Sequence, residues 1–127
     1  MFKILLVEDN FDYRGALNTA LLKRYADLET RETSALRDTL DIVEVYLPNL
    51  VIMDINLQCD LNGLDLTKII TNMHPEVVVV ILSRHDMPEY RSAARRNGAD
   101  FFLSKSSSLE SIFEYVDSIV LHDIVLQ

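Results

Sequence analysis

Acidic, hydroxyl and amine side chains stand at the ends of four short apolar runs in this chain. Glu8 and Asp9 follow the first run, and Asp54 follows the second. Ser83 ends the third run, and Lys105 comes shortly after the fourth. Such a set can hold a divalent cation and neutralise a phosphoryl group, because carboxylate oxygens suit Mg²⁺, while ammonium and hydroxyl groups suit phosphate oxygens.

The three acids predict a metal site. Asp9 and Asp54 are the expected direct ligands, and Glu8 is expected to act through a water molecule. The backbone carbonyl of Asn56 would add a further oxygen. No histidine or cysteine stands beside these acids in the sequence, and an all-oxygen site favours Mg²⁺, with Mn²⁺ as the alternative ion. Clustered carboxylates without a cation raise one another's pKa values.

Asp54 has a second expected role as a nucleophile. A carboxylate can accept a phosphoryl group to form an aspartyl phosphate. Because the transferred group is negatively charged, most of the catalysis comes from positioning and charge neutralisation. Lys105 and Ser83 are the expected partners of the phosphoryl oxygens. Each residue taken singly has a plainer interpretation as a surface group at the end of a strand, and it is their order and register together that favour phosphoryl chemistry.

The elements that must bring these residues together are strands and helices in alternation. Consecutive apolar residues at 4–7, 50–53 and 77–82 are typical of parallel strands covered on both faces. A polar segment at 28–33 and a brief apolar run at 101–103 predict two further strands. Alternation of this kind indicates an α/β fold, a doubly wound five-stranded parallel sheet of the (βα)5 flavodoxin-like type with strand order 2-1-3-4-5. The acids then fall at its switch point, between the first and third strands.

A helix pattern follows each predicted strand. Asn10 and Ser34 are the expected N-caps of the first two helices, because their side chains can accept a hydrogen bond from a free backbone N–H. Helical spacing places Leu47 and Met73 on the apolar faces of the second and third helices. Gly98 is expected to end the fourth helix in a left-handed conformation.

Composition narrows the class of protein. A length of 127 residues fits a single domain spanning 1–127. A net charge of −8 argues against direct nucleic-acid binding, which ordinarily needs a basic surface. Cys59 is the only cysteine, and the apolar start of the chain is too short for a signal peptide or a membrane span. We therefore expect a soluble, cytoplasmic protein.

Several stretches resemble the receiver domain of two-component response regulators, a family that includes chemotaxis regulators. They are 4–10, 51–55, 62–66, 81–83 and 97–105. The resemblance implies that Asp54 accepts a phosphoryl group from a histidine kinase or phosphotransfer protein and that Lys105 completes the site. Ser83 would be the switch hydroxyl and Phe102 the switch aromatic. The resemblance also implies a signalling domain rather than an enzyme. Its output domain, effector or second copy would use the face formed by the fourth helix, fifth strand and last helix.

Departures from the family pattern are few. Ser106 stands where the family usually has proline, and Phe102 lacks the hydroxyl of the commoner tyrosine. The loop at 57–61 is slightly long and lacks the usual Met-Pro.

Two alternatives belong to other classes. An Asp- and Mg²⁺-dependent phosphohydrolase of the haloacid-dehalogenase kind would need a second acid two residues after the nucleophile, where this chain has Asn56. A flavodoxin-like module would need a phosphate-binding loop rich in Ser, Thr and Gly after the first strand. Glu8 and Asp9 would instead repel a flavin phosphate.

Overall fold

Five parallel strands form one sheet in the part of the chain that the computed structural model describes, which is residues 1–55, 62–84, 87–106 and 109–126. The strand order is β2-β1-β3-β4-β5, as the sequence predicts. The strands are β1 (Phe2–Val7), β2 (Leu28–Thr33), β3 (Leu50–Met53), β4 (Val78–Ser83) and β5 (Phe101–Ser104). The helices between and after them are α1 (Phe11–Arg24), α2 (Leu36–Tyr46), α3 (Gly63–Met73), α4 (Pro88–Arg96) and α5 (Leu109–Leu126).

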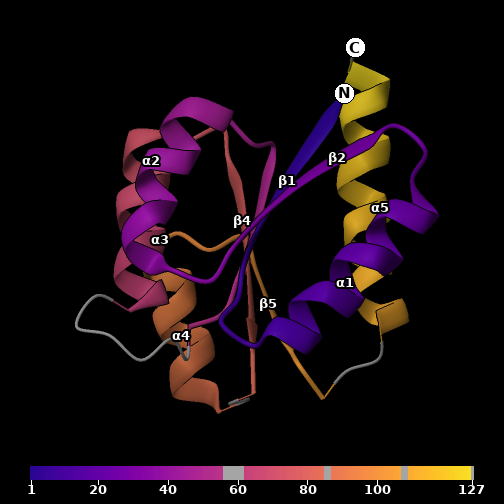
Figure 1. Cartoon of the computed structure of the whole chain (residues 1–127). Helices are drawn as coiled ribbons and strands as arrows, with labels where there is room; N and C mark the ends of the chain where they lie inside the picture. The colour runs from indigo at the N-terminus through magenta and orange to yellow at the C-terminus, as the bar shows by residue number, and fades with distance from the viewer. Residues whose placement is uncertain (56–61, 85–86, 107–108, 127) are drawn as a thin grey trace.

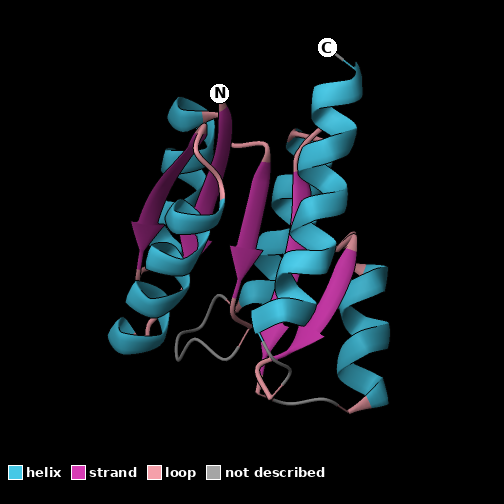
Figure 2. Ribbon diagram, turned by 90° about the vertical axis from the view of Figure 1, so that its right-hand side faces the viewer, coloured by secondary structure: helices cyan, strands magenta, loops and turns pink. Residues whose placement is uncertain are grey.

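Helices cover both faces of the sheet. Figure 1 views the sheet nearly edge-on, with α2, α3 and α4 on one side and α1 and α5 on the other. Figure 2, turned by 90°, shows the strands running in one direction, with α5 in front of part of the sheet. Two buried clusters match these layers, one reaching α2, α3 and α4 and the other reaching α1 and α5. The fold is therefore the predicted doubly wound α/β type.

Successive residues of each central strand enter different clusters. In β1, Leu5 and Val7 pack towards α2, α3 and α4, whereas Ile4 and Leu6 pack towards α1 and α5. Because side chains alternate across a strand, a strand covered on both faces must be apolar at every position. This requirement explains the continuous apolar runs in the sequence.

The register of the sheet aligns the ends of its central strands. Val7 of β1 pairs with Met53 of β3, and Met53 pairs in turn with Ile81 of β4. The backbone continues this pairing past the strands, because the Asp54 N–H donates to the Val7 carbonyl over 3.0 Å. The Lys105 N–H likewise donates to the Ser83 carbonyl over 2.7 Å. Residues that follow these strands are thus brought to one edge.

Local signals at the helix ends are partly as predicted. Asn10 caps α1, since its Oδ1 accepts a hydrogen bond from the Tyr13 N–H over 3.0 Å. The prediction that Ser34 caps α2 is wrong: α2 begins after Ala35, whose N–H donates instead to the Thr33 hydroxyl over 3.2 Å. Gly98 has a positive φ of 94°, as predicted for the end of α4.

Two apolar residues predicted on helix faces are exposed. Leu47 is 57% exposed and Met73 is 58% exposed. Leu47 is the left-handed C-cap residue of α2, and Met73 is the last residue of α3, so both lie where the chain turns away from the core. None of the helices in the described part of the chain has the length and apolar character that a membrane crossing requires.

Candidate functional site

The residues that the sequence singles out meet at the carboxyl edge of the sheet. Lys105 Nζ donates a hydrogen bond to Asp54 Oδ2 over 3.0 Å and also forms an ion pair with Glu8 Oε1. All three side chains are at least nine-tenths buried. Ser83, at the end of β4, is also buried. A cation and two carboxylates at the ends of three different strands are what the predicted topology requires.

Three acids are close enough to share one metal ion. Glu8, Asp9 and Asp54 each offer a carboxylate oxygen, and these oxygens lie within 4.8 Å of one another. Asp9 is exposed while the other two are buried, so the cluster opens to solvent on one side. Oxygen donors of this kind suit a hard divalent cation. The predicted fourth donor, the carbonyl of Asn56, lies outside the described residues.

Burial shapes the electrostatics of the acids. The pKa of Glu8 is raised from 4.5 to about 7, first by burial and then by its hydrogen bond and charge interaction with Asp54. Lys105 opposes this rise, because its ammonium stabilises the charged carboxylate. The predicted repulsion between neighbouring acids is therefore present at Glu8, and Lys105 offsets part of it.

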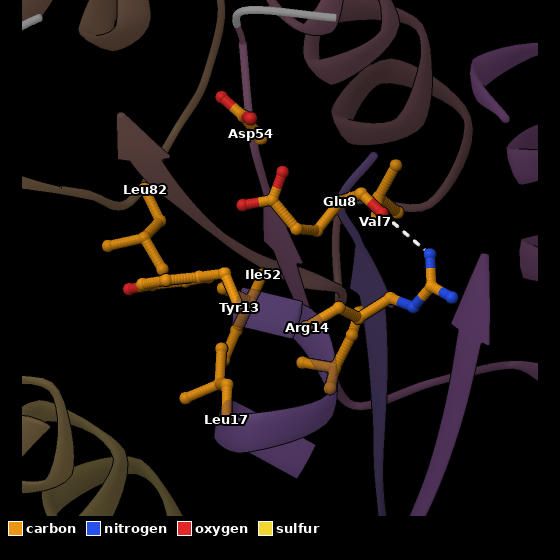
Figure 3. A pocket seen from close by; sticks show the side chains of 9 residues that line it. Val7, Glu8, Tyr13, Arg14, Leu17, Ile52, Asp54 and Leu82 are labelled. Carbon is orange, nitrogen blue, oxygen red and sulfur yellow. Dashed lines mark hydrogen bonds between the residues drawn. The ribbon is translucent and has the colours of Figure 1, made fainter. Parts of the chain in front are cut away.

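Glu8 is also held through its backbone and its neighbours. Its carbonyl accepts a hydrogen bond from Arg14 Nη1 over 2.8 Å, drawn as a dashed line in Figure 3. Arg14 in turn pairs with Glu32 of β2 over 3.2 Å. The Asn10 N–H donates to Glu8 Oε2 over 3.3 Å. The start of α1 is thus tied to the end of β1 that carries the acids.

A small pocket lies beside the two buried carboxylates. Figure 3 shows the ring of Tyr13 beside Glu8 and close to Leu82. The pocket is lined by Leu6, Val7, Glu8, Tyr13, Arg14, Leu17, Ile52, Asp54 and Leu82. Sequence reasoning missed Tyr13 and Arg14. The available signal for Tyr13 is its spacing, because it stands four residues before Leu17 and so heads the apolar stripe of α1.

The expected switch aromatic, Phe102, pairs with Ile81 of β4, which pairs with Met53, the residue before Asp54. Phe102 is 8% exposed and belongs to the cluster under α4. The Arg91 guanidinium lies 4.9 Å from the centre of its ring, and Arg91 Nη1 is 3.5 Å from the Phe102 carbonyl. Next to it, Phe101 stacks on Tyr115 with 4.2 Å between ring centres. The face formed by α4, β5 and α5 is thus rich in aromatic contacts.

The peptide bond between Lys105 and Ser106, both described, is trans.

Comparison with known proteins identifies the family. Residues 4–117 match the model of the response regulator receiver domain, and the chain belongs to this family. It is 34% identical over 118 residues to the transcriptional regulatory protein MctR of Rhizobium johnstonii, covering 92% of this chain and 54% of that protein. The chain thus spans about half the length of this relative.

Solved structures agree on the fold. The crystal structure of the receiver domain of NtrX from Brucella abortus is 32% identical, with a TM-score of 0.82, covering 91% of this chain and 96% of that one. A signal receiver domain from Colwellia psychrerythraea, at 16% identity, has a TM-score of 0.88 and covers 94% and 98% of the two chains.

Family membership decides between the classes considered. The chain is a receiver domain of two-component response regulators, a signalling domain rather than an enzyme of the classical kind. Receiver domains act with histidine kinases and output domains. The phosphohydrolase and flavodoxin alternatives are not favoured by this match.

Proposed function

We propose that Asp54 accepts a phosphoryl group from a histidine kinase or phosphotransfer protein. The observation that carries the proposal is the contact of Lys105 Nζ with Asp54 Oδ2 at 3.0 Å, in a buried site that also holds Glu8. An ammonium group so placed offsets charge that develops on the oxygens of a transferred phosphoryl group. Burial strengthens this interaction by lowering the local dielectric.

The chemical step is a direct displacement at phosphorus. An oxygen of the Asp54 carboxylate forms a bond to phosphorus, while the bond from phosphorus to the donor nitrogen breaks. That nitrogen keeps the electron pair, and the product is an aspartyl phosphate. Lys105 and the Ser83 hydroxyl interact with the phosphoryl oxygens, Lys105 as a fixed cation and Ser83 as a hydrogen-bond donor.

Mg²⁺ is the proposed metal, with Mn²⁺ as the alternative ion. Asp9 and Asp54 would bind it directly and Glu8 through water, consistent with carboxylate oxygens within 4.8 Å of one another. The carbonyl of Asn56 remains a predicted ligand. When bound, the ion would neutralise charge on the phosphoryl oxygens. Asp9 is the exposed member of the set, and it faces the side from which an ion can enter.

Phosphorylation is proposed to act as a switch. A phosphoryl group adds a charge of about −1.5 to −2 and strong acceptor oxygens. Ser83 would turn towards these oxygens, and Phe102 would repack in the space beside it. The face of α4, β5 and α5 would then change, where an effector, an output domain or a second copy of the chain can detect it. Arg91 and Phe101 lie on this face.

The domain extent, cellular location and partners of the protein are also proposals. We propose that 1–127 forms one receiver domain, that it acts in the cytoplasm, and that it does not bind nucleic acid itself, given a net charge of −8. Histidine kinases would supply the phosphoryl group, and an output domain or a separate effector would receive the signal.

The test is labelling by a small phosphodonor. The unchanged protein incubated with acetyl phosphate and Mg²⁺ should gain one phosphoryl group by mass spectrometry, and chelation of the metal should prevent the gain. Asp54→Asn should remain unlabelled, because an amide is a poor nucleophile. Asp41→Asn, an exposed acid on α2, is the matched control and should label normally. Undiminished labelling of Asp54→Asn would refute the assignment.

A further inference from the structure

The ring of Tyr13 lies against the ammonium group of Lys105. Lys105 Nζ is 4.8 Å from the centre of the ring, within the distance at which an aromatic face attracts a cation. The same ammonium contacts the carboxylates of Asp54 and Glu8. It therefore has two carboxylates and one aromatic ring around it, and these come from three different segments of the chain.

Local structure fixes where this ring lies. The Tyr13 N–H donates to Asn10 Oδ1, and the Asn10 N–H donates to Glu8 Oε2, so the first turn of α1 is tied to the site. The ring lines the same pocket as Leu17 and Leu82 (Figure 3). Tyr13 is thus held both by its backbone and by the apolar side chains beside its ring.

The phenol contributes through its ring and carries no charge. The pKa of Tyr13 is raised to about 12, first by burial and then by the negative charges of Glu8 and Asp54. At neutral pH the hydroxyl stays protonated and adds no third negative charge next to Lys105. The face of a neutral ring is the surface that favours a cation.

A lysine side chain needs such a support, because its flexible stem has considerable rotamer entropy to lose when the ammonium is fixed. We propose that Tyr13 is a positioning residue whose aromatic face holds the Lys105 ammonium against Asp54 and shields it from solvent. The phosphoryl oxygens then meet a cation that is already in place. The inference rests on the proposed phosphoacceptor role of Asp54.

The first experiment compares two substitutions by their initial rate of labelling with acetyl phosphate and Mg²⁺. Tyr13→Phe keeps the ring and should retain most of the rate. Tyr13→Leu keeps apolar volume without a ring and should label on the order of threefold to tenfold more slowly. Tyr25→Leu, which removes a half-buried tyrosine at the other end of α1, is the matched control and should label normally. If Tyr13→Leu does not fold, Tyr13→Met takes its place, because it also lacks a ring.

A second measurement follows Lys105 directly and does not depend on phosphorylation. An amine-reactive ester is applied in the absence of phosphodonor, and acylation of Lys105 is followed by peptide mass spectrometry. Exposed Lys23 and Lys68 serve as internal references. Tyr13→Leu should acylate at Lys105 several-fold faster than the unchanged protein, and Tyr13→Phe should not. Equal acylation in all three proteins would overturn the inference.

A double-mutant cycle separates positioning from a general structural effect. If Tyr13 acts through Lys105, adding Tyr13→Leu to Lys105→Met should slow labelling no further. Full additivity, or a loss in Tyr13→Phe as large as in Tyr13→Leu, would overturn the inference. Failure of the proposed function would give a different result. Either the unchanged protein would take no phosphoryl label, or Asp54→Asn would take as much label as the unchanged protein. The acylation of Lys105 would still decide the role of Tyr13 in either case.

Discussion

The Arg91 guanidinium of α4 lies over the ring of Phe102 in β5, 4.9 Å from the ring centre. Phe102 has no hydroxyl through which a hydrogen bond could fix its ring, and it is 8% exposed. The contact with Arg91, an exposed residue, therefore covers the outer side of a buried aromatic ring. This pair connects α4 to the strand position level with Met53, the residue before Asp54.

Replacing Arg91 should loosen Phe102. In Arg91→Met, loss of an exposed cation–π contact worth about 0.5–1 kcal/mol should let the ring leave its buried position more often. Fluorine NMR of protein carrying 4-fluorophenylalanine, with the Phe102 resonance assigned by Phe102→Leu, should show a shifted or exchange-broadened signal. Arg96→Met, also an exposed arginine of α4, is the control. An unchanged Phe102 resonance in Arg91→Met would show that the guanidinium does not restrain the ring.

Removing the Lys105 ammonium should destabilise the fold as well as the chemistry. Lys105→Met leaves the buried carboxylates of Glu8 and Asp54 without their cation, and breaking a buried ion pair from one side costs about 3 kcal/mol. Urea unfolding in the absence of metal at pH 8 should show this loss. Adding Glu8→Gln should restore part of it, because one of the two carboxylates is then neutral. A Lys105→Met protein as stable as the unchanged one would contradict the buried ion pair.

The raised pKa of Glu8 predicts that the free energy of unfolding of the metal-free protein depends on pH. Its folded-state pKa of about 7 exceeds the ordinary 4.5, so between these values the folded state binds more protons than the unfolded state. The free energy of unfolding then falls as pH rises from about 4.5 to about 7 and becomes level above that range, as far as Glu8 contributes. Urea unfolding across this range measures the slope. Glu8→Gln should remove this component, and equal slopes in both proteins would contradict it.

Much of the site follows from the sequence because it is set by strand ends. With Glu8 and Asp54 at the ends of parallel strands in the order 2-1-3-4-5, the topology requires that they approach each other, and the structure brings them together. The capping role of Asn10 is predictable for a similar reason, since a cap depends only on the first turn of its own helix.

The prediction for Ser34 fails because the preceding Thr33 offers a competing hydroxyl. The ring of Tyr13 over Lys105 joins α1 to the end of β5, and no local spacing reveals such a contact.

Two glycines provide a matched test of how the turn after α4 is packed. Gly98 has a φ of 94°, and a Cβ added there would clash with Thr71 Oγ1 of α3. Gly98→Ala should therefore lower the free energy of unfolding by about 2 kcal/mol, from left-handed strain and from the clash. Adding Thr71→Ala should recover only part of the loss, because it removes the clash and leaves the strain.

Gly15 is the opposite case. It lies within α1, and a Cβ added there would meet nothing within 4 Å. Gly15→Ala should raise the free energy of unfolding by about 0.5–1 kcal/mol, because alanine loses less backbone entropy in a helix. Urea unfolding of both single variants measures the contrast. Equal changes in the free energy of unfolding for Gly98→Ala and Gly15→Ala would contradict this interpretation. They would show that neither the left-handed backbone nor the approach of Thr71 restricts position 98 to glycine.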